Sequence, residues 1–407
     1  MSVIKNLDAK IRAYALKNAI SHDGKAQPGA VISALFIEGL DKSKVKDVMP
    51  QVNKLVQDMN KLSLPEQEEL FDELKEYVSE REGRKEGELP ELPNVKKGKI
   101  VMRFAPSPSG PLHIGHAATG CISALYVKKY GGTFYVRIED TNPENIYTPA
   151  YKMIAQESEW LFGKETKVLI QSDRMQIYYD YVEKLLKKDA VYVCTCSQED
   201  FKKLADGKKD CPCRVKTSKE NIADWKKMLD KKGFLEGGAV LRFKSGMQQA
   251  NPAFRDFPLA RINESEHPRQ KKKYRVWPLM NLAVAVDDIE LGMTHIIRAK
   301  DHRDNAKKQE FIFEVLGKPI PWSAFLGRYH FTDFELSSTQ TRKAIEEGKY
   351  SGWDDKRLPT IASLKKQGYK PQAFWGFAVR VGLSENDKIM ERSEYFSLLD
   401  LFNKENQ

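Results

Sequence analysis

The sequence contains no long hydrophobic run, and this absence excludes a membrane-spanning protein. No stretch approaches the roughly 18 consecutive apolar residues that a transmembrane helix needs. The start of the chain, MSVIKNLDAKIRAYALKNAI, interleaves charged with apolar residues and is therefore not a signal peptide. We expect a cytoplasmic protein that makes no contact with a membrane.

Cysteine is also scarce, because five residues in a chain of 407 are too few for a disulfide scaffold. Four of the five form two close pairs, Cys194-Thr-Cys196 and Cys211-Pro-Cys213, joined by a short charged segment. Four thiolates suit a tetrahedral Zn²⁺ ion, and with all four positions filled the metal would be structural. The alternative is four free thiols in a hairpin. Cys121 lies on an apolar helix face, where we expect a core residue.

Negative charge is in the minority, with 57 acidic against 67 basic side chains and a net charge of +10. Residues 1–95 carry 14 of the basic and 17 of the acidic residues, so 53 basic and 40 acidic residues follow them. The excess of basic residues after residue 95 predicts a polyanionic partner. Solubility alone would account for the same charge, so composition leaves both explanations open.

The first part of the chain has the pattern of helices, and the length predicts two to four domains at about 100–200 residues each. In residues 1–82 apolar side chains recur every three or four positions. Ser63-Leu-Pro65-Glu66 has the cap, the early proline and the later glutamate of a helix start. A linker rich in Gly, Glu and Pro at 81–98 closes this helical domain near residue 85.

The body of the chain begins with an α/β pattern. Strands are predicted at 99–104 and 133–138, with a helix from about 115 to 130 between them, which is the unit of a parallel sheet. Short strands with Gly and Pro from about 190 to 285 indicate an insertion, and the α/β pattern returns at 282–298. The last 75 residues are mainly helical in pattern.

Two histidines lie at the start of the predicted helix that follows the first strand, in Pro111-Leu-His113-Ile-Gly115-His116. A helix N-terminus offers unpaired N–H groups and a positive dipole end, which suit phosphate. Gly115 would let a ligand approach the backbone closely. Imidazoles three residues apart can donate to phosphate oxygens as charge develops. An isolated pair of this kind could equally be a helix cap or half of a metal site.

The motif belongs to a longer pattern. This pattern consists of two segments, Arg103-Phe-Ala-Pro-Ser-Pro-Ser-Gly-Pro-Leu-His-Ile-Gly-His116 and Tyr130-Gly-Gly-Thr-Phe-Tyr-Val-Arg-Ile-Glu-Asp-Thr141. Together they resemble the class I aminoacyl-tRNA synthetases. More narrowly, they are similar to glutamyl-tRNA synthetases of archaeal type. The resemblance covers residues 97 to 395 and includes Gln171-Ser-Asp-Arg174 and Gly352-Trp-Asp-Asp355.

This resemblance implies an α/β fold with a Rossmann-like catalytic domain, an inserted α+β acceptor-binding domain and a preceding all-α N-terminal domain. The expected segments are a helical domain at 1–85, the first half of the catalytic domain at 97–190, the insertion with its zinc hairpin at 191–281, the second half at 282–330, and the signature loop with a helical stem-contact region at 331–407.

The resemblance also implies a reaction and its residues. Glutamate and ATP, with Mg²⁺, would form glutamyl-adenylate, and the acyl group would pass to the 3′ end of tRNA. The family's catalytic and ATP-binding positions fall on His113, Gly115, His116, Leu336 and Ser337, and its glutamate-binding positions on Arg103, Ser107, Glu139 and Arg298. A substrate with two carboxylates and one ammonium requires guanidinium groups to bind its carboxylates and a carboxylate to bind its ammonium. Without the family, Arg137 and Glu139 would be taken for a surface ion pair.

A basic run follows in the insertion. Runs of this kind are usually solvated faces, but beside a synthetase motif they predict phosphate contacts to the acceptor end of tRNA. The residues concerned are Arg269, Lys271, Lys272, Lys273 and Arg275.

Three departures from the family favour an alternative, a degenerate homologue that binds tRNA or a partner protein without efficient amino-acid activation. The signature loop has Glu335 and none of its own lysines, and Arg342 or Lys343 would have to replace them. Met280 stands where the family commonly has tyrosine. No β-barrel pattern precedes the end at Gln407, so we expect an anticodon-binding subunit to be separate, or another protein to dock on the N-terminal helices.

Overall fold

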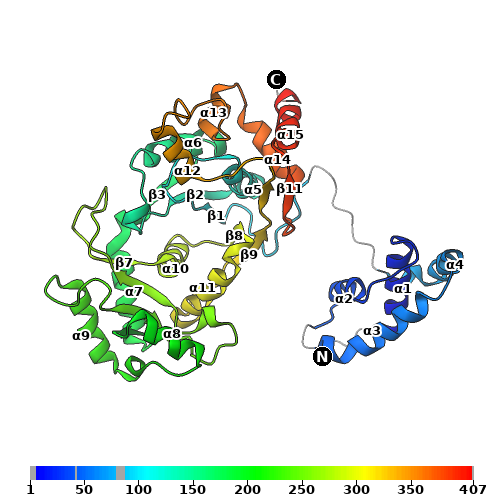
Figure 1. Ribbon diagram of the computed structural model, residues 1–407, viewed down its shortest axis with the longest axis horizontal. Coiled ribbons are helices and arrows are strands. Elements are labelled where there is room, and N and C mark those ends of the chain that lie inside the picture. The colour runs from blue at the N-terminus through cyan, green and yellow to red at the C-terminus, as the bar shows by residue number, and fades with distance from the viewer. Residues whose placement is uncertain (1–5, 42–43, 79–87, 406–407) are drawn as a thin grey trace. The chain divides into compact units, whose positions relative to one another are not determined.

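The computed structural model describes residues 6–41, 44–78 and 88–405 (Figure 1). The chain divides into two compact units, Met1–Lys85 and Glu86–Gln407. Among the described residues, no helix is long and apolar enough to cross a membrane.

The first unit consists of helices, as predicted. They are α1 (Leu7–Ile20), α2 (Pro28–Ile37), α3 (Val45–Met59), α4 (Leu64–Leu74) and a 3₁₀ turn at Lys75–Tyr77. The predicted start of α4 is confirmed, because Ser63 and Glu66 form a capping box with Pro65 in the first turn. The core of this unit contains only its own residues, including Ile11, Leu16 and Leu35.

The second unit begins with a parallel sheet, of which the first two strands and the helix between them were predicted from the apolar pattern, whereas the third strand was not. Strands β1, β2 and β3 lie side by side in that order, with Met102 opposite Phe134 and Tyr135 opposite Lys167. The elements are β1 (Ile100–Phe104), α5 (Ile114–Tyr130), β2 (Gly132–Ile138), α6 (Ala150–Phe162) and β3 (Lys167–Ile170).

A second parallel pair lies on the other side of β1. Strand β8 (His295–Ala299) pairs with β9 (Trp322–Leu326), and the apolar run at 282–288 is the helix α10 (Met280–Glu290). Thr294 joins the start of β8 to β1, since its N–H donates to the Val101 carbonyl at 3.0 Å and its Oγ1 accepts from the Val101 N–H at 3.0 Å. Strands β2 and β3 therefore lie on one side of β1, and strands β8 and β9, which come later in the chain, lie on its other side. Ligands bind at such a switch point, beyond the carboxyl ends of the strands.

The insertion is a four-stranded antiparallel sheet with helices at its side. Its core is continuous with helices before and after it, because α7 (Met175–Lys187), α10 and α11 (Arg303–Leu316) contribute buried residues to it. The sheet order is β4 (Val191–Cys194), β5 (Val240–Phe243), β6 (Pro258–Ile262) and β7 (Val276–Pro278), with helices α8 (Gln198–Asp206) and α9 (Ser218–Leu229).

The C-terminal segment is mainly helical, as predicted, but it shares the core of the catalytic sheet. Phe374, Phe377 and Tyr395 are buried in that core, and the Trp375 indole donates to the Leu161 carbonyl at 2.7 Å. Two short parallel strands, β10 and β11, had not been predicted. The elements are β10 (Tyr329–Phe331), α12 (Ser338–Glu346), α13 (Ile361–Lys366), α14 (Pro371–Val381), β11 (Lys388–Met390) and α15 (Arg392–Glu405).

Candidate active site

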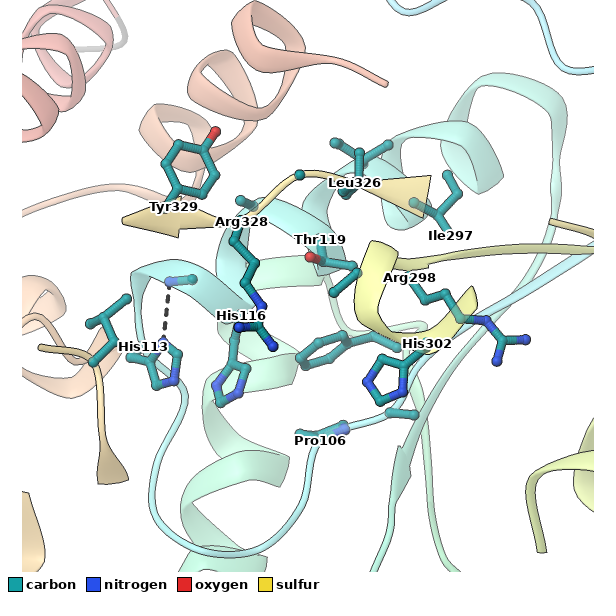
Figure 2. Close-up of a pocket in the computed structure, with 18 of the residues that line it drawn as sticks. Pro106, His113, His116, Thr119, Ile297, Arg298, His302, Leu326, Arg328 and Tyr329 are labelled. Atoms are coloured by element: carbon teal, nitrogen blue, oxygen red, sulfur yellow. Dashed lines mark hydrogen bonds between the residues drawn. The ribbon is translucent and has the colours of Figure 1, made fainter. Parts of the chain in front are cut away.

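A cavity of about 690 Å³ opens at the carboxyl ends of β1 and β8 (Figure 2). It brings together eight of the nine residues predicted to bind ATP or glutamate, namely Arg103, Ser107, His113, Gly115, His116, Glu139, Arg298 and Leu336. The ninth, Ser337, does not line the cavity. Its side chain caps α12 by accepting a hydrogen bond from the N–H of Gln340.

His113 and His116 lie at the start of α5 with their rings stacked, at a centroid separation of 3.7 Å (Figure 2). The cap interpretation is correct for His113, because its Nδ1 accepts the Gly115 N–H at 3.2 Å. Desolvation by the surrounding protein lowers the pKa of His113 well below its usual value and that of His116 to about 4. Both rings are therefore neutral at pH 7. Because Nδ1 of His113 accepts from Gly115, the ring N–H of His113 is on Nε2, where it can donate to a ligand.

Among the described residues, no further histidine, cysteine or carboxylate joins the two histidines to make a metal-binding group. Across the described part of the chain, the only group of three or more side chains that could hold a metal is the cysteine cluster. The motif is braced by backbone instead, because the Ile114 N–H donates to the Pro359 carbonyl and the Ile361 N–H to the Leu112 carbonyl. The buried carboxyl of Glu157 accepts the Leu112 N–H at 2.6 Å, and burial raises the pKa of Glu157 to about 8.

Behind the glutamate-binding candidates lies a buried ion network. Asp288 accepts hydrogen bonds from Nε and Nη2 of Arg103, both at 3.2 Å, and from Nη1 of Arg137 at 2.6 Å. Although burial opposes ionisation, the neighbouring guanidinium groups hold the pKa of Asp288 at about 2. Arg137 also donates to Glu139 at 3.1 Å. The interpretation of Arg137 and Glu139 as a surface pair is wrong, because Arg137 has 0% of its surface exposed.

Arg298 differs from Arg103 and Arg137 because, among the described residues, it has no carboxylate hydrogen-bond partner. It is 8% exposed, and its hydrogen bond within the described chain goes from Nη1 to the neutral Oε1 of Gln309 at 2.9 Å. Its Nε is buried and has no partner among the described residues. Burial first, and then the charge of Arg103, lower the pKa of Arg298 to about 9, so it is still charged at pH 7. A buried charge without a carboxylate partner is costly, and an anionic ligand would stabilise it.

The two departures from the family pattern also face the cavity, since Glu335 and Met280 both line it. Arg342 and Lys343 do not line it, and they lie 3.9 Å from Glu346 and Glu347. Other cations that sequence reasoning missed are present instead. Figure 2 shows Arg328 reaching towards His116 from the segment between β9 and β10, and Lys388 lines the same cavity. Arg328 also pairs with Asp301.

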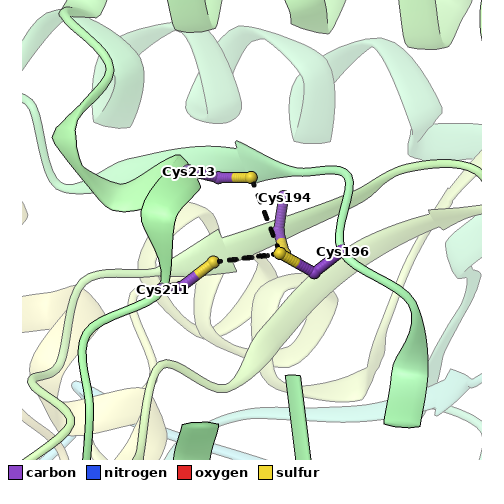
Figure 3. A group of neighbouring side chains, drawn as sticks. All are labelled: Cys194, Cys196, Cys211 and Cys213. Atoms are coloured by element: carbon purple, nitrogen blue, oxygen red, sulfur yellow. Dashed lines mark hydrogen bonds between the residues drawn. The ribbon is translucent and has the colours of Figure 1, made fainter. Parts of the chain in front are cut away.

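The four clustered cysteines converge as their spacing predicts (Figure 3). The sulfur of Cys211 lies 3.6 Å from those of Cys194 and Cys196, and the Cys196 and Cys213 sulfurs are 3.9 Å apart. Four sulfurs at about 2.3 Å from a zinc ion in a tetrahedron would lie about 3.8 Å from one another. The donor set fits Zn²⁺, since these three spacings are close to the tetrahedral value and all four sulfurs lie within 4.8 Å of one another.

The basic run of the insertion divides into two parts. Lys271, Lys272 and Lys273 are exposed at a turn, where Lys271 lies 3.5 Å from Glu266. Arg269 is half-exposed and pairs with Asp173 at 2.6 Å.

The predicted RNA contact of Arg275 is wrong. Arg275 is 6% exposed, and it donates to Glu264 and to the backbone carbonyls of Met228, Asp230 and Phe234. These bonds use its guanidinium inside the insertion, and no RNA phosphate can reach it.

Comparison with known proteins gives a family and a fold. A family model described as tRNA synthetases class I (E and Q), catalytic domain, matches residues 99–404. The glutamate–tRNA ligase of Methanocaldococcus jannaschii is 44% identical over 382 residues, which cover 94% of this chain and 68% of that protein. The glutamate–tRNA ligase of Pyrococcus furiosus is 44% identical over 383 residues, covering 92% of this chain and 67% of the relative. The crystal structure of a glutamate-tRNA synthetase from Elizabethkingia anophelis shares the fold, with a TM-score of 0.53, 20% identity and coverage of 76% of this chain and 70% of that one.

Proposed function

The chain belongs to the class I tRNA synthetases of the glutamate and glutamine group, and from this premise we propose that it is a glutamate–tRNA ligase. The enzyme activates glutamate with ATP to give glutamyl-adenylate and pyrophosphate, and then transfers the glutamyl group to the 3′ end of tRNA. The choice of substrate rests on Arg298, a buried guanidinium in the cavity that has no carboxylate hydrogen-bond partner among the described residues.

In the binding step, the chain supplies charges of both signs to one amino acid. Arg298 and Arg103 offer donors to carboxylates, and Glu139 offers an acceptor to the ammonium group. Arg103 is held in place by Asp288 and Glu139 by Arg137. The site is thus pre-organised, which lowers the cost of ordering it around the substrate.

In the activation step, a carboxylate oxygen of glutamate attacks the α-phosphorus of ATP, and pyrophosphate leaves. The new negative charge lies on phosphate oxygens, so catalysis is positioning and electrostatic stabilisation. His113 and His116 donate from the head of α5, and Arg328 and Lys388 supply the positive charge that the signature loop lacks. The family uses ATP with Mg²⁺, whose charge would offset that of the phosphates.

Arg328 and Lys388 also weaken the argument for a degenerate homologue. That alternative is favoured by Glu335 and Met280, which line the cavity. The missing loop lysines are no longer a reason for inactivity, because two other cations line the same cavity. We therefore prefer the active ligase, and amino-acid activation is the test that separates the two.

We further propose that the four cysteines hold one structural Zn²⁺ ion. The spacing of their sulfurs supports this, and so does the small apolar cluster around them, which besides the cysteines contains Tyr192, Phe201 and Met247 as buried members. So small a cluster gains little from burial alone, and metal ligation would supply the rest. Because the reaction serves protein synthesis, the compartment that we propose is the cytoplasm.

The exposed lysines of the insertion are proposed as contacts to the acceptor end of tRNA. Changing Lys271, Lys272 and Lys273 together to Ala should reduce the salt dependence of tRNA binding by up to about two or three units of slope, roughly 0.7–0.9 for each lost phosphate contact. Filter binding at several salt concentrations measures this slope. As a matched control, changing Lys54, Lys61 and Lys75 of the first unit removes the same charge. An unchanged slope in the first variant would contradict the assignment.

The helical unit is assigned to binding rather than catalysis, because none of its described residues lines the cavity. Residues 1–85 should fold alone, since their core contains no residue from elsewhere. Residues 86–407 should then retain amino-acid activation within about threefold, a change below 1 kcal/mol. Circular dichroism and ATP–pyrophosphate exchange measure the two properties. A folded 86–407 fragment that had lost most of its exchange activity would show that the helices support the active site.

A further inference from the structure

Asp288 lies at the centre of the buried network behind the cavity. It is 2% exposed, and its two oxygens accept from both Arg103 and Arg137. Asp287, its neighbour on α10, accepts from Arg174 at 2.7 Å and from the Tyr178 hydroxyl at 2.8 Å, and lies 3.8 Å from Nε of Arg137. Asp288 is the carboxylate that contacts both Arg103 and Arg137.

The charges of this network do not balance. It contains four guanidinium groups, on Arg103, Arg137, Arg174 and Arg298, and three carboxylates, on Glu139, Asp287 and Asp288. His302 also lines the cavity, but burial lowers its pKa, so it adds no charge at pH 7. The seven charged groups of this network thus sum to one net positive charge, and Arg298 is the guanidinium among them without a carboxylate hydrogen-bond partner in the described chain. Arg328, Lys388 and Glu335 line the cavity outside this network and are not counted.

Glutamate at pH 7 carries two carboxylates and one ammonium, and hence one net negative charge. The site and this ligand are therefore complementary in total charge as well as in their individual groups. Glutarate has the same two carboxylates without the ammonium and carries two negative charges. It would leave the occupied site with an uncompensated buried charge, which is unfavourable.

We propose that Asp288, with Arg137, is a positioning residue that sets the net charge of the amino-acid site at +1 and so makes it select a monoanionic amino acid over a dianion. This proposal rests on the proposed function, because it assumes that glutamate binds in this cavity. Asp288 acts through Arg103 and Arg137 and does not touch the ligand. Its role is therefore distinct from that of the residues lining the cavity.

The proposal is tested by comparing the Kd values of glutamate and glutarate, measured by ligand-observed NMR titration of the full chain. The quantity of interest is the ratio of the glutarate Kd to the glutamate Kd. Asp288→Asn raises the net charge of the site by one and should lower the ratio about tenfold or more, because unit charges a few Å apart interact strongly in a buried site. Arg137→Gln lowers the net charge by one and should raise the ratio by a similar factor. The Arg137→Gln/Asp288→Asn double variant restores the charge and should restore the wild-type ratio to within about threefold.

Opposite shifts in the two single variants, cancelled in the double variant, would support the proposal. A purely structural role would leave the ratio unchanged in Asp288→Asn and would lower it in Arg137→Gln, which frees Glu139 from its partner; either result would overturn the proposal. If Asp288→Asn fails to fold, Arg137→Gln and the double variant decide the matter, because Arg137→Gln leaves the Arg103–Asp288 pair intact. If the wild-type chain bound no glutamate at all, the proposed function would fail, and this inference with it. Glutamate binding with unchanged ratios would overturn the inference alone.

Discussion

Replacing Arg298 by methionine is expected to lower kcat/KM for glutamate in ATP–pyrophosphate exchange by roughly 10²- to 10³-fold. This corresponds to about 3–4 kcal/mol, within the range for truncating one partner of a buried charge pair. The loss should be large because Arg298 is buried and hydrogen-bonds only to a neutral amide among the described residues, so the folded chain already bears the cost of desolvating it. The effect should appear in the KM for glutamate much more than in the KM for ATP.

The same substitution is not expected to destabilise the folded chain. It removes a buried charge that has no carboxylate hydrogen-bond partner among the described residues, and the shorter apolar side chain occupies part of the same space. A thermal melt of the Arg298→Met variant should therefore have a midpoint no lower than that of the wild type.

Two controls make the Arg298 result interpretable. Arg298→Lys keeps the charge but loses the fork of donors, so it should fall between the wild type and Arg298→Met. Arg12→Met removes an arginine of the first unit that pairs with Asp8 and should leave exchange unchanged. If Arg298→Met kept kcat/KM within threefold of the wild type, Arg298 could not be the group that binds a glutamate carboxylate.

Removing one ligand of the cysteine cluster is the second change with a large expected effect. Protein purified without chelator should contain one zinc per chain, and Cys211→Ser should contain none. Structural zinc contributes about 10–16 kcal/mol to the folding of small peptides, and the sheet that carries the cluster will offset part of this loss. We therefore expect local unfolding between Ser197 and Val215 rather than collapse of the whole chain. Elemental analysis and limited proteolysis of this segment measure the two effects.

Cys121→Ala is the matched control for the metal. Cys121 is buried in the catalytic core, away from the cluster, so this variant should keep its zinc although it loses some core packing. Native protein that contained no metal and had four titratable thiols in the cluster would contradict the zinc assignment.

The sequence predicts the site best where its residues lie close together along the chain. Arg103, His113 and His116 belong to one strand–loop–helix unit, so the end of β1 and the start of α5 bring them together. The two cysteine pairs are likewise joined by a short segment that can fold back on itself. In both cases local geometry restricts where the side chains can point.

The parts that sequence reasoning missed depend on pairings between distant segments. Asp288 meets Arg103 across 185 positions, and Glu157 meets Leu112 across 45. No local pattern of charge indicates these partners. The wrong interpretation of Arg275 has the same origin, because only the folding of β7 against the rest of the insertion turns this member of a basic run inwards.

Activation of glutamate by this chain is measured by glutamate-dependent ATP–pyrophosphate exchange. The assay should be run with glutamate, aspartate and glutamine, each with and without tRNA. We predict exchange with millimolar glutamate and at most about one hundredth of that rate with the other two, since a buried charge that loses its partner costs several kcal/mol. No exchange with glutamate under either condition would contradict the account and favour a homologue that binds tRNA or a partner protein without activating an amino acid.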